Sequence, residues 1–203
     1  MFKKITLQLA GFPARYPRHS FLLFSLMFMP VMSHAVNSCH VQLASNATVY
    51  SSADAAALQQ AIDNATAGDT LKISGTCAGV QTVNGKVQSV YVSKSLTLQG
   101  GYDGVDWSTS NPLENITVLD GQNNGRVIYV ADGIEATLDG LTIKNGSTGA
   151  EGAGIYAKGD ITISNSIIRE NIASAVGGGI YVRHGVNGST QIINSQIINN
   201  RSN

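Results

Sequence analysis

Acidic and aromatic side chains gather in one stretch, residues 100–121, which holds the only tryptophan of the chain. Asp103 and Asp106 carry the hard oxygen atoms that Ca²⁺ prefers, although a calcium site needs several more oxygens than these two aspartates supply. Tyr102 and Trp107 carry flat amphipathic rings that could contact a glycan or another ligand. We favour the interpretation in which the rings fold back over a sheet and Asp103-Gly104 and Asp120-Gly121 form turns. We expect no cofactor, with calcium in this stretch as the one alternative.

The sequence shows no clear pair of catalytic carboxylates. A glycosidase needs two carboxyl groups facing each other across the scissile bond. From residue 122 onward the carboxylates stand singly, most of them beside glycine or asparagine as in turns. The nearest approach to a mixed acidic and basic cluster is Arg169-Glu170 together with Arg183-His184. His184 has no serine or cysteine partner that the sequence identifies, so a hydrolytic triad has no support. We interpret the two arginines as solvated turn charges and predict no catalytic residue.

The two cysteines, Cys39 and Cys77, both lie in the part of the chain that we expect to be exported. In an oxidising compartment such a pair usually closes a disulfide, and we predict one here. His40 beside Cys39 suggests a metal site instead. Two cysteines and one histidine without paired short spacings do not make a typical zinc set, so no metal is predicted.

Residues 1–35 have the pattern of a signal peptide. An apolar segment at 21–32 follows a basic region, and small residues at 33–35 suit cleavage after Ala35. The apolar segment is short for a bilayer span and contains Pro30, although a retained N-terminal anchor stays an alternative. We therefore expect the protein to be exported, to the extracellular space or the outer-membrane surface. The basic residues are Lys3, Lys4, Arg15 and Arg18.

The remaining chain, residues 36–203, is predicted to form one domain. It contains nine Lys and Arg against thirteen Asp and Glu, a formal charge of −4, and its basic residues form no sequence cluster. This balance argues against nucleic acid and anionic lipid as partners. No further apolar run is long enough to cross a membrane as a helix.

One motif recurs through the second half of the chain. Tyr129, Tyr156 and Tyr181 are 27 and 25 residues apart, and each follows an isoleucine. A set of asparagines recurs at a similar period, 26 and 29 residues apart: Asn145, Asn171 and Asn200. Such a period is typical of a repeat protein, in which each unit buries its apolar face against its neighbours. We expect like residues to stack on like.

Within each repeat the apolar residues come in short runs rich in Ile, Val and Thr, broken by Gly, Asn, Asp and Ser. This pattern predicts short strands, and about three of them fill one coil of a right-handed parallel β-helix. An antiparallel sandwich also contains many short strands, but it does not explain a fixed period with residue-by-residue echoes.

One helix is predicted, at residues 52–66, where alanines surround Leu58 and Ile62 and where Ser52 or Asp54 could cap the start. A short amphipathic helix there suits a cap over the open end of a solenoid. Residues 71–73 would be the first strand, and Cys77 would lie in a turn at 75–79. Strands at 90–92 and 96–98 would follow.

Three short motifs carry a resemblance to a known group of proteins. Glycines precede isoleucine at 177–180, and an Ile-x-x-Asn pattern occurs at 168–171 and again at 197–200. Together with the Gly-Gly-Tyr start and Asp-Gly end of 100–121, they resemble the repeats of bacterial polymorphic outer-membrane proteins, which are autotransporter passenger-like β-helix surface proteins. The resemblance implies a right-handed β-helix, a pectin lyase-like fold, exposed at a cell surface.

The chain stops directly after a predicted strand, so we expect either a truncated passenger or an open coil that associates with itself or with a partner. The expected function is that of a secreted or surface-exposed repeat protein with an adhesive or structural role. Polysaccharide or a host cell-surface protein is the expected partner. The alternative is a polysaccharide-degrading lyase or glycosidase, because this fold class also houses such enzymes.

Overall fold

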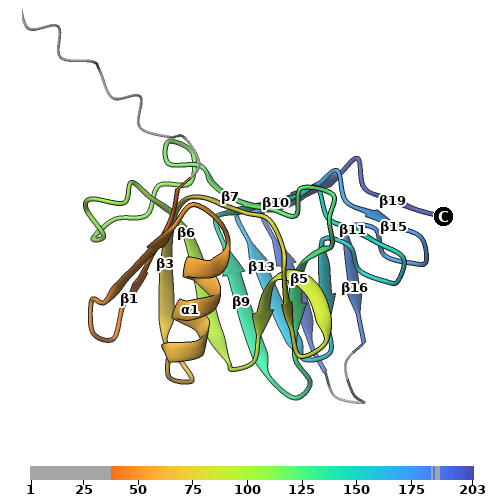
Figure 1. The fold of residues 1–203 in the computed structure, drawn as a ribbon, viewed down its shortest axis with the longest axis horizontal. Helices are drawn as coiled ribbons and strands as arrows, with labels where there is room; N and C mark the ends of the chain where they lie inside the picture. The colour runs from red at the N-terminus through yellow and green to blue at the C-terminus, as the bar shows by residue number, and fades with distance from the viewer. Residues whose placement is uncertain (1–37, 184, 186–187) are drawn as a thin grey trace, which may run out of the picture. The chain divides into compact units, whose positions relative to one another are not determined.

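A computed structural model describes residues 38–183, 185 and 188–203 of the chain. The predicted signal peptide and its cleavage site lie outside the described residues, as does His184. The described part is an all-β parallel solenoid of about five turns, with one helix (Figure 1). This arrangement confirms the predicted parallel β-solenoid and excludes the antiparallel sandwich.

The longest sheet forms two sides of each coil. Its strands run in the order β17-β13-β9-β6-β3-β7-β10-β14-β18, and β3 belongs to both sides. One side contains β3 (Thr70–Ala78), β6 (Leu96–Tyr102), β9 (Glu135–Asp139), β13 (Asp160–Ser164) and β17 (Thr190–Ile193). The other contains β7 (Thr117–Asp120), β10 (Leu141–Lys144), β14 (Ile167–Arg169) and β18 (Gln196–Ile198).

A second sheet, in the order β16-β12-β8-β5-β4, closes the coils on another side. Its strands are β4 (Gln81–Val83), β5 (Lys86–Val92), β8 (Arg126–Val130), β12 (Ile155–Ala157) and β16 (Ile180–Val182). A small third sheet contains β11 (Ser147–Thr148), β15 (Ile172–Ala173) and β19 (Arg201–Ser202). Neighbouring strands pair in parallel except in the hairpin of β4 with β5 and around β1.

The structure corrects the predicted beginning of the fold. An antiparallel hairpin, β1 (Cys39–Leu43) and β2 (Val49–Ser52), precedes the strand at 71–73 and pairs with it. Cys77 lies inside β3 and pairs with Leu119, not in a turn. The strand continues past Gly75 because that glycine has a φ of +78°, which bends the chain without ending it.

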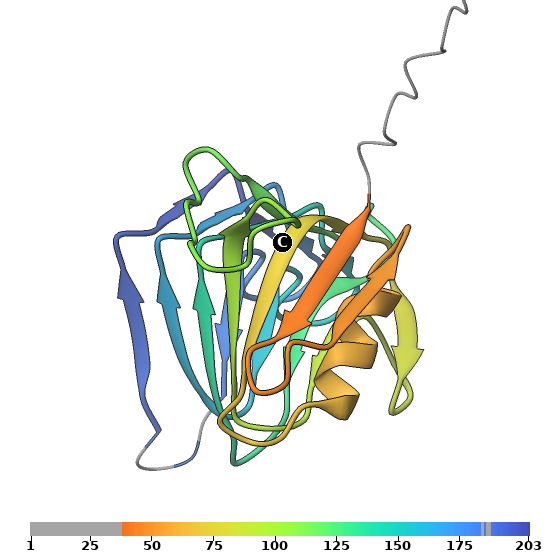
Figure 2. The same cartoon turned by 90° about the vertical axis from the view of Figure 1, so that its left-hand side faces the viewer.

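The single helix, α1, spans Ala56–Asn64, so it begins later than the predicted 52–66. Ser52 still belongs to β2, but its hydroxyl accepts a hydrogen bond from the Ala57 N–H at 3.0 Å. At the other end, Lys94 Nζ donates to the last helical carbonyls, including that of Asp63 at 2.7 Å, where a cation also suits the helix dipole. Figure 2 faces the end of the molecule where the hairpin and α1 lie.

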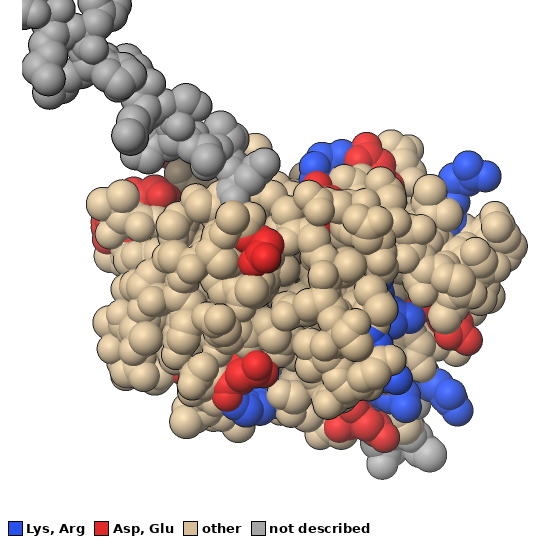
Figure 3. Space-filling view, viewed as in Figure 1, with Lys and Arg blue, Asp and Glu red and all other residues tan. Residues whose placement is uncertain are grey.

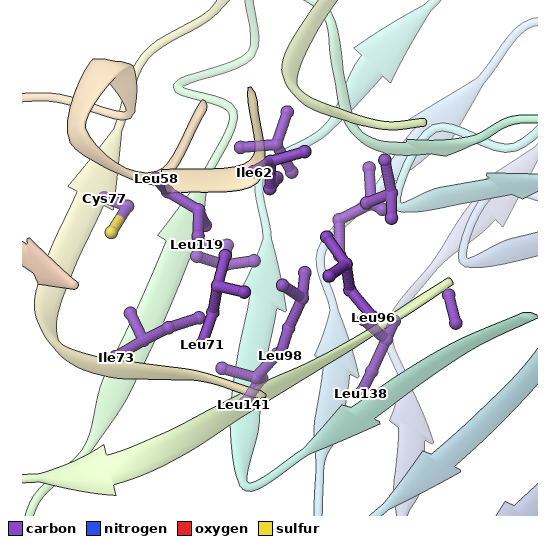
Figure 4. Packing of buried hydrophobic residues seen from close by; sticks show 14 of the residues in the cluster. Leu58, Ile62, Leu71, Ile73, Cys77, Leu96, Leu98, Leu119, Leu138 and Leu141 are labelled. Carbon is purple, nitrogen blue, oxygen red and sulfur yellow. The ribbon is translucent and has the colours of Figure 1, made fainter. Parts of the chain in front are cut away.

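Apolar side chains stack in files along the inside of the coils. Leu71, Leu98, Leu138 and Ile163 occupy equivalent positions in successive strands and are fully buried. Leu58 and Ile62 of α1 join the same core (Figure 4). Burial of each such side chain stabilises the folded chain by about 1.5 to 3 kcal/mol. In the last described coil the next residue of the file, Ile192, is 45% exposed.

No helix in residues 38–183, 185 and 188–203 has the length and apolar character that crossing a bilayer requires.

Candidate functional site

A groove of about 570 Å³ lies between the long connection at 103–116 and the ends of the strands beside it. We call it the loop groove. The connection contributes Ser110, Asn111, Pro112 and Leu113, and successive coils contribute Gln99, Asp139, Asn165, Ser166, Ile167, Asn194 and Gln196.

A row of three polar side chains crosses the coils at this groove, which two of them, Gln99 and Asp139, line directly. Gln99, Asp139 and Ser164 occupy equivalent positions on β6, β9 and β13. The Asp139 carboxylate accepts hydrogen bonds from Ser164 Oγ at 2.7 Å, Asn165 Nδ2 at 2.8 Å and Gln99 Nε2 at 3.1 Å. Tyr102 Oη donates in turn to Gln99 Oε1 at 2.7 Å. The row is therefore held in one geometry before any ligand arrives.

The Asp139 carboxyl is charged at neutral pH. Burial by itself would raise its pKa, but the hydrogen bonds from Ser164, Asn165 and Gln99 stabilise the anion, and the net pKa lies below the usual value. Asp139 can thus accept further hydrogen bonds, but it is poorly suited to act as a general acid.

Apolar groups of the long connection form the opposite wall. Leu113 is 92% exposed and stands beside Pro112. The connection is fixed by its backbone, because the Asn111 N–H donates to the Gly101 carbonyl at 2.7 Å. A Cβ atom at Gly101 would lie 2.8 Å from Pro112 N, and one at Gly140 would lie 2.7 Å from Pro112 Cγ. Glycine at both positions lets the wall approach the coils closely.

The turns in the groove explain why asparagine recurs there. Asn165 and Asn194 have φ of 49° and 48°, in the left-handed region that asparagine tolerates better than most residues. Gly140, with a φ of 66°, occupies the same turn one coil earlier. Asp139 lies opposite Ser164 rather than opposite Asn165. Asp139 and Asn165 are 26 residues apart, close to the repeat period, yet their positions in the coils differ by one residue.

Chemically, this arrangement suits recognition of hydroxyl groups. Amide, hydroxyl and carboxylate groups face an apolar wall, as in many binding sites where a few fixed polar groups orient a ligand. Among the described residues that line the groove, Asp139 is the one carboxylate, so they do not provide the two that glycoside hydrolysis needs.

The two predicted ligand-contacting rings pack on each other instead of lining this groove. Tyr102 is 4% exposed, and its ring centroid lies 5.7 Å from that of the half-buried Trp107. Lys72 Nζ lies 5.5 Å from the Tyr102 ring centroid and donates to the Trp107 carbonyl at 2.6 Å. Tyr102 reaches the groove only through its hydroxyl, by way of Gln99.

The aspartates of the same connection stabilise turns. Asp103 Oδ1 accepts the N–H groups of Val105 and Asp106, at 2.8 and 2.7 Å. The backbone and hydroxyl hydrogen bonds of Ser108 lower the pKa of Asp106. Within the described part of the chain, no three His, Cys, Asp or Glu side chains are grouped as metal ligands.

The repeated tyrosines form a ladder on the outer face of the second sheet. Ring centroids are 5.0 Å apart for Tyr129 and Tyr156 and 5.4 Å for Tyr156 and Tyr181. Tyr91 extends the ladder, 5.1 Å from Tyr129, and the repeat pattern missed it. The insertion of 103–116 lengthens that coil, so Tyr91 falls outside the period.

The repeated asparagines stack only in part. Asn171 Nδ2 donates to Asn200 Oδ1 at 2.9 Å, and Asn171 is fully buried. Asn145 is not their equivalent: the pairing of neighbouring strands places Gly146 beside Asn171. Asn145 instead donates to Asp120 Oδ1 at 3.0 Å.

The remaining predicted residues lie apart from the loop groove. Cys39 and Cys77 form a disulfide. Arg169 and Glu170 form a partly exposed ion pair at 2.6 Å. Arg183 is exposed on another face and lines a different cavity.

Together these features define a parallel β-solenoid with a preorganised polar groove beside one long connection. No protein-family model matches the chain, and neither a curated protein nor a solved structure shows significant similarity to it.

Proposed function

We propose that the protein is an exported, surface-exposed β-solenoid that adheres to polysaccharide through the loop groove. The observation that carries this proposal is the hydrogen-bonded row of Gln99, Asp139 and Ser164, whose first two members line the same groove as the exposed Leu113. Hydrogen bonds to a charged acceptor are worth more than neutral ones, and a groove ordered in advance loses little entropy on binding. Sugar hydroxyls can donate to the row while their C–H faces contact the wall.

Export is supported by the sequence pattern of residues 1–35. A disulfide between Cys39 and Cys77 also fits an oxidising compartment. The glycine and Ile-x-x-Asn motifs add the likeness to repeats of polymorphic outer-membrane proteins, which would make the chain a piece of a passenger. In this proposal the solenoid is right-handed and α1 caps its first coil, a role supported by the burial of Leu58 and Ile62 against the core.

The test is retention of the full chain on an array of plant and microbial polysaccharides. Asp139→Asn removes the charge at the centre of the row, and we expect about tenfold weaker retention. Glu135→Gln is the matched control, because Glu135 is an exposed carboxylate on the same strand, outside the groove. Its retention should equal that of the parent chain.

The same array distinguishes adhesion from catalysis. New reducing ends or unsaturated ends in the eluate would show that the chain cleaves polysaccharide. The alternative function, that of a polysaccharide lyase or glycosidase, would then take the place of adhesion. Folded protein that is retained on no polysaccharide, or equal losses in Asp139→Asn and Glu135→Gln, would overturn the proposal.

A further inference from the structure

A second groove, of about 550 Å³, lies along the tyrosine ladder and shares no residue with the loop groove. We call it the ladder groove. Tyr129 and Tyr156 line it together with four cations, Lys86, Arg126, Lys158 and Arg183. Figure 3 shows Lys and Arg side chains gathered towards the lower right of the face on which Figure 1 labels β5 and β16.

The ladder groove concentrates positive charge in a chain that is otherwise acidic. Residues 36–203 carry a formal charge of −4, yet four of their nine Lys and Arg side chains line this one cavity. Glu151 is the one carboxylate among its described lining residues. Within the described part of the chain, none of the four cations forms an ion pair, since the two pairs present join Lys144 to Asp120 and Arg169 to Glu170.

Arg126 is the most unusual of the four, because it is only 7% exposed. Its Nε donates to the Gly152 carbonyl at 2.8 Å and its Nη2 to the Glu151 carbonyl at 2.6 Å. The guanidinium carbon lies 4.9 Å from the ring centroid of Tyr156 and 5.6 Å from that of Tyr129. A guanidinium has five N–H donors, so three stay available.

A buried cation that forms no ion pair is unfavourable. Burial lowers the pKa of Arg126, and the Glu151 carboxylate of the same groove opposes this shift only from beyond ion-pair distance. The two carbonyl dipoles and the nearby rings of Tyr129 and Tyr156 compensate part of the lost hydration, but less than a paired carboxylate does. The phenol of Tyr129 does not supply the missing negative charge, because burial raises its pKa. An anion from outside would complete this site.

The other cations are placed to bind a second anionic group of the same ligand. Lys158 and Arg183 directly follow Ala157 and Val182, which pair in neighbouring coils. Two like charges at adjacent positions repel each other unless an anion lies between them. Arg126 is the first residue of β8, and Lys158 directly follows the last residue of β12. In the register of these two strands, the two positions are five residues apart along the strand direction. At 3.3 Å per residue this separation is about 16 Å.

The ladder itself argues against nucleic acid as the ligand. Stacking of Tyr129 between Tyr91 and Tyr156 occupies both of its ring faces, so no base can stack there. What the groove still offers is ring edges and phenol hydroxyls, together with the hydroxyls of Ser147 and Thr148. These groups suit the hydroxyls of a sugar.

We propose that the ladder groove binds an extended anionic glycan, with one carboxylate or sulfate group on Arg126 and another between Lys158 and Arg183. This inference is independent of adhesion through the loop groove and does not require it.

The test is binding of the full chain to immobilised alginate oligosaccharides, heparin and neutral dextran, at low and physiological salt. Lys158→Gln and Arg183→Gln should each weaken anionic binding about threefold, and the double variant about tenfold. Both side chains reach the surface, so the changes leave the fold intact. Arg169→Gln is the matched control, because it removes a partly exposed cation outside the groove. Arg126→Lys keeps the charge but loses the planar fork, and it should weaken binding more than either single variant.

Binding to alginate alone would assign carboxylate, binding to heparin alone would assign sulfate, and binding to both would assign anionic charge in either form. Each of these supports the proposal if Arg169→Gln binds as the parent does. Equal losses in Arg169→Gln, no binding at low salt, or equal affinity for polyglutamate or single-stranded DNA would overturn it. Failure here is distinguishable from failure at the loop groove, because the two grooves share no residue and the variants of Lys158, Arg183 and Arg126 leave the lining of the loop groove intact.

Discussion

Gly154 lies against the side-chain amide of Asn171, and this contact joins the asparagine of an Ile-x-x-Asn motif to a glycine that precedes isoleucine, as Gly179 also does. A Cβ atom at Gly154 would lie 2.9 Å from Asn171 Nδ2 and closer still to the Gly179 carbonyl of the next coil. One coil on, Gly179 meets Asn200 in the same way. The glycine motif therefore makes room for the asparagine motif, which explains why the two occur together.

The first prediction concerns this contact. Gly154→Ala should lower the free energy of unfolding by about 2 kcal/mol, and Tm by roughly 5 °C, because a backbone carbonyl stands where the methyl group must go. Gly149→Ala is the control, since its Cβ would meet no atom within 4 Å. Thermal unfolding of both variants measures the difference, and equal melting temperatures would contradict the proposed packing.

The buried amide of Asn171 should matter at least as much. Asn171 Oδ1 accepts the Gly146 N–H at 2.7 Å, and Nδ2 donates to Asn200 and to the Ile143 carbonyl. Asn171→Ala removes these partners in a fully buried place, so we expect a loss of about 3 kcal/mol in urea unfolding. Asn124→Ala, at an exposed position, should change stability by less than about 0.5 kcal/mol. A similar effect of both changes would contradict this account.

The repeat architecture could be predicted from the sequence because successive coils place equivalent residues side by side. Tyr129, Tyr156 and Tyr181 recur at nearly one coil length, and the structure stacks their rings. The sequence was a poorer guide to which residues of successive coils lie side by side. Coils differ in length by a few residues and asparagine is frequent, so Asn145 matched Asn171 in the sequence while Gly146 is its true neighbour.

Both grooves depend on contacts that no local pattern reveals. The donors to Asp139 come from Gln99, 40 residues earlier, and from Ser164 and Asn165, 25 and 26 residues later. Lys86 and Arg183 are even further apart in the chain, yet they line one cavity. Only the register of the coils, which the long insertion at 103–116 obscures, brings such residues together.

Reduction of the disulfide should loosen one end of the molecule and leave the rest folded. Cys39 and Cys77 are 38 residues apart. A disulfide that closes a loop of this length stabilises the folded state by about 4 kcal/mol, because it lowers the conformational entropy of the unfolded chain. We expect a reducing agent to lower Tm and to speed hydrogen exchange in β1 and β2, while β9 and β12 stay protected. The double variant Cys39→Ala/Cys77→Ala should behave as the reduced chain and no longer respond to the reducing agent. Equal acceleration in every coil would contradict a local role.

Acid should destabilise the fold in part through Asp139. Its pKa is lower in the folded chain than the value of about 3.9 expected when unfolded, so its stabilising effect is fully present above that value. The effect is lost as the pH falls below about 4 and then through the lower pKa of the folded chain. Because the side chain is partly exposed, solvent screening keeps this contribution small.

Asp139→Asn should therefore be less stable than the parent chain at pH 7 and approach it in stability as the pH falls towards 2. Urea unfolding at a series of pH values measures this convergence. Glu135→Gln changes the same charge on the same strand without touching the hydrogen bonds of Asp139, so its curve should run parallel to that of the parent. A constant gap between Asp139→Asn and the parent across the whole series would show that the hydrogen-bonded row does not stabilise the charged carboxylate.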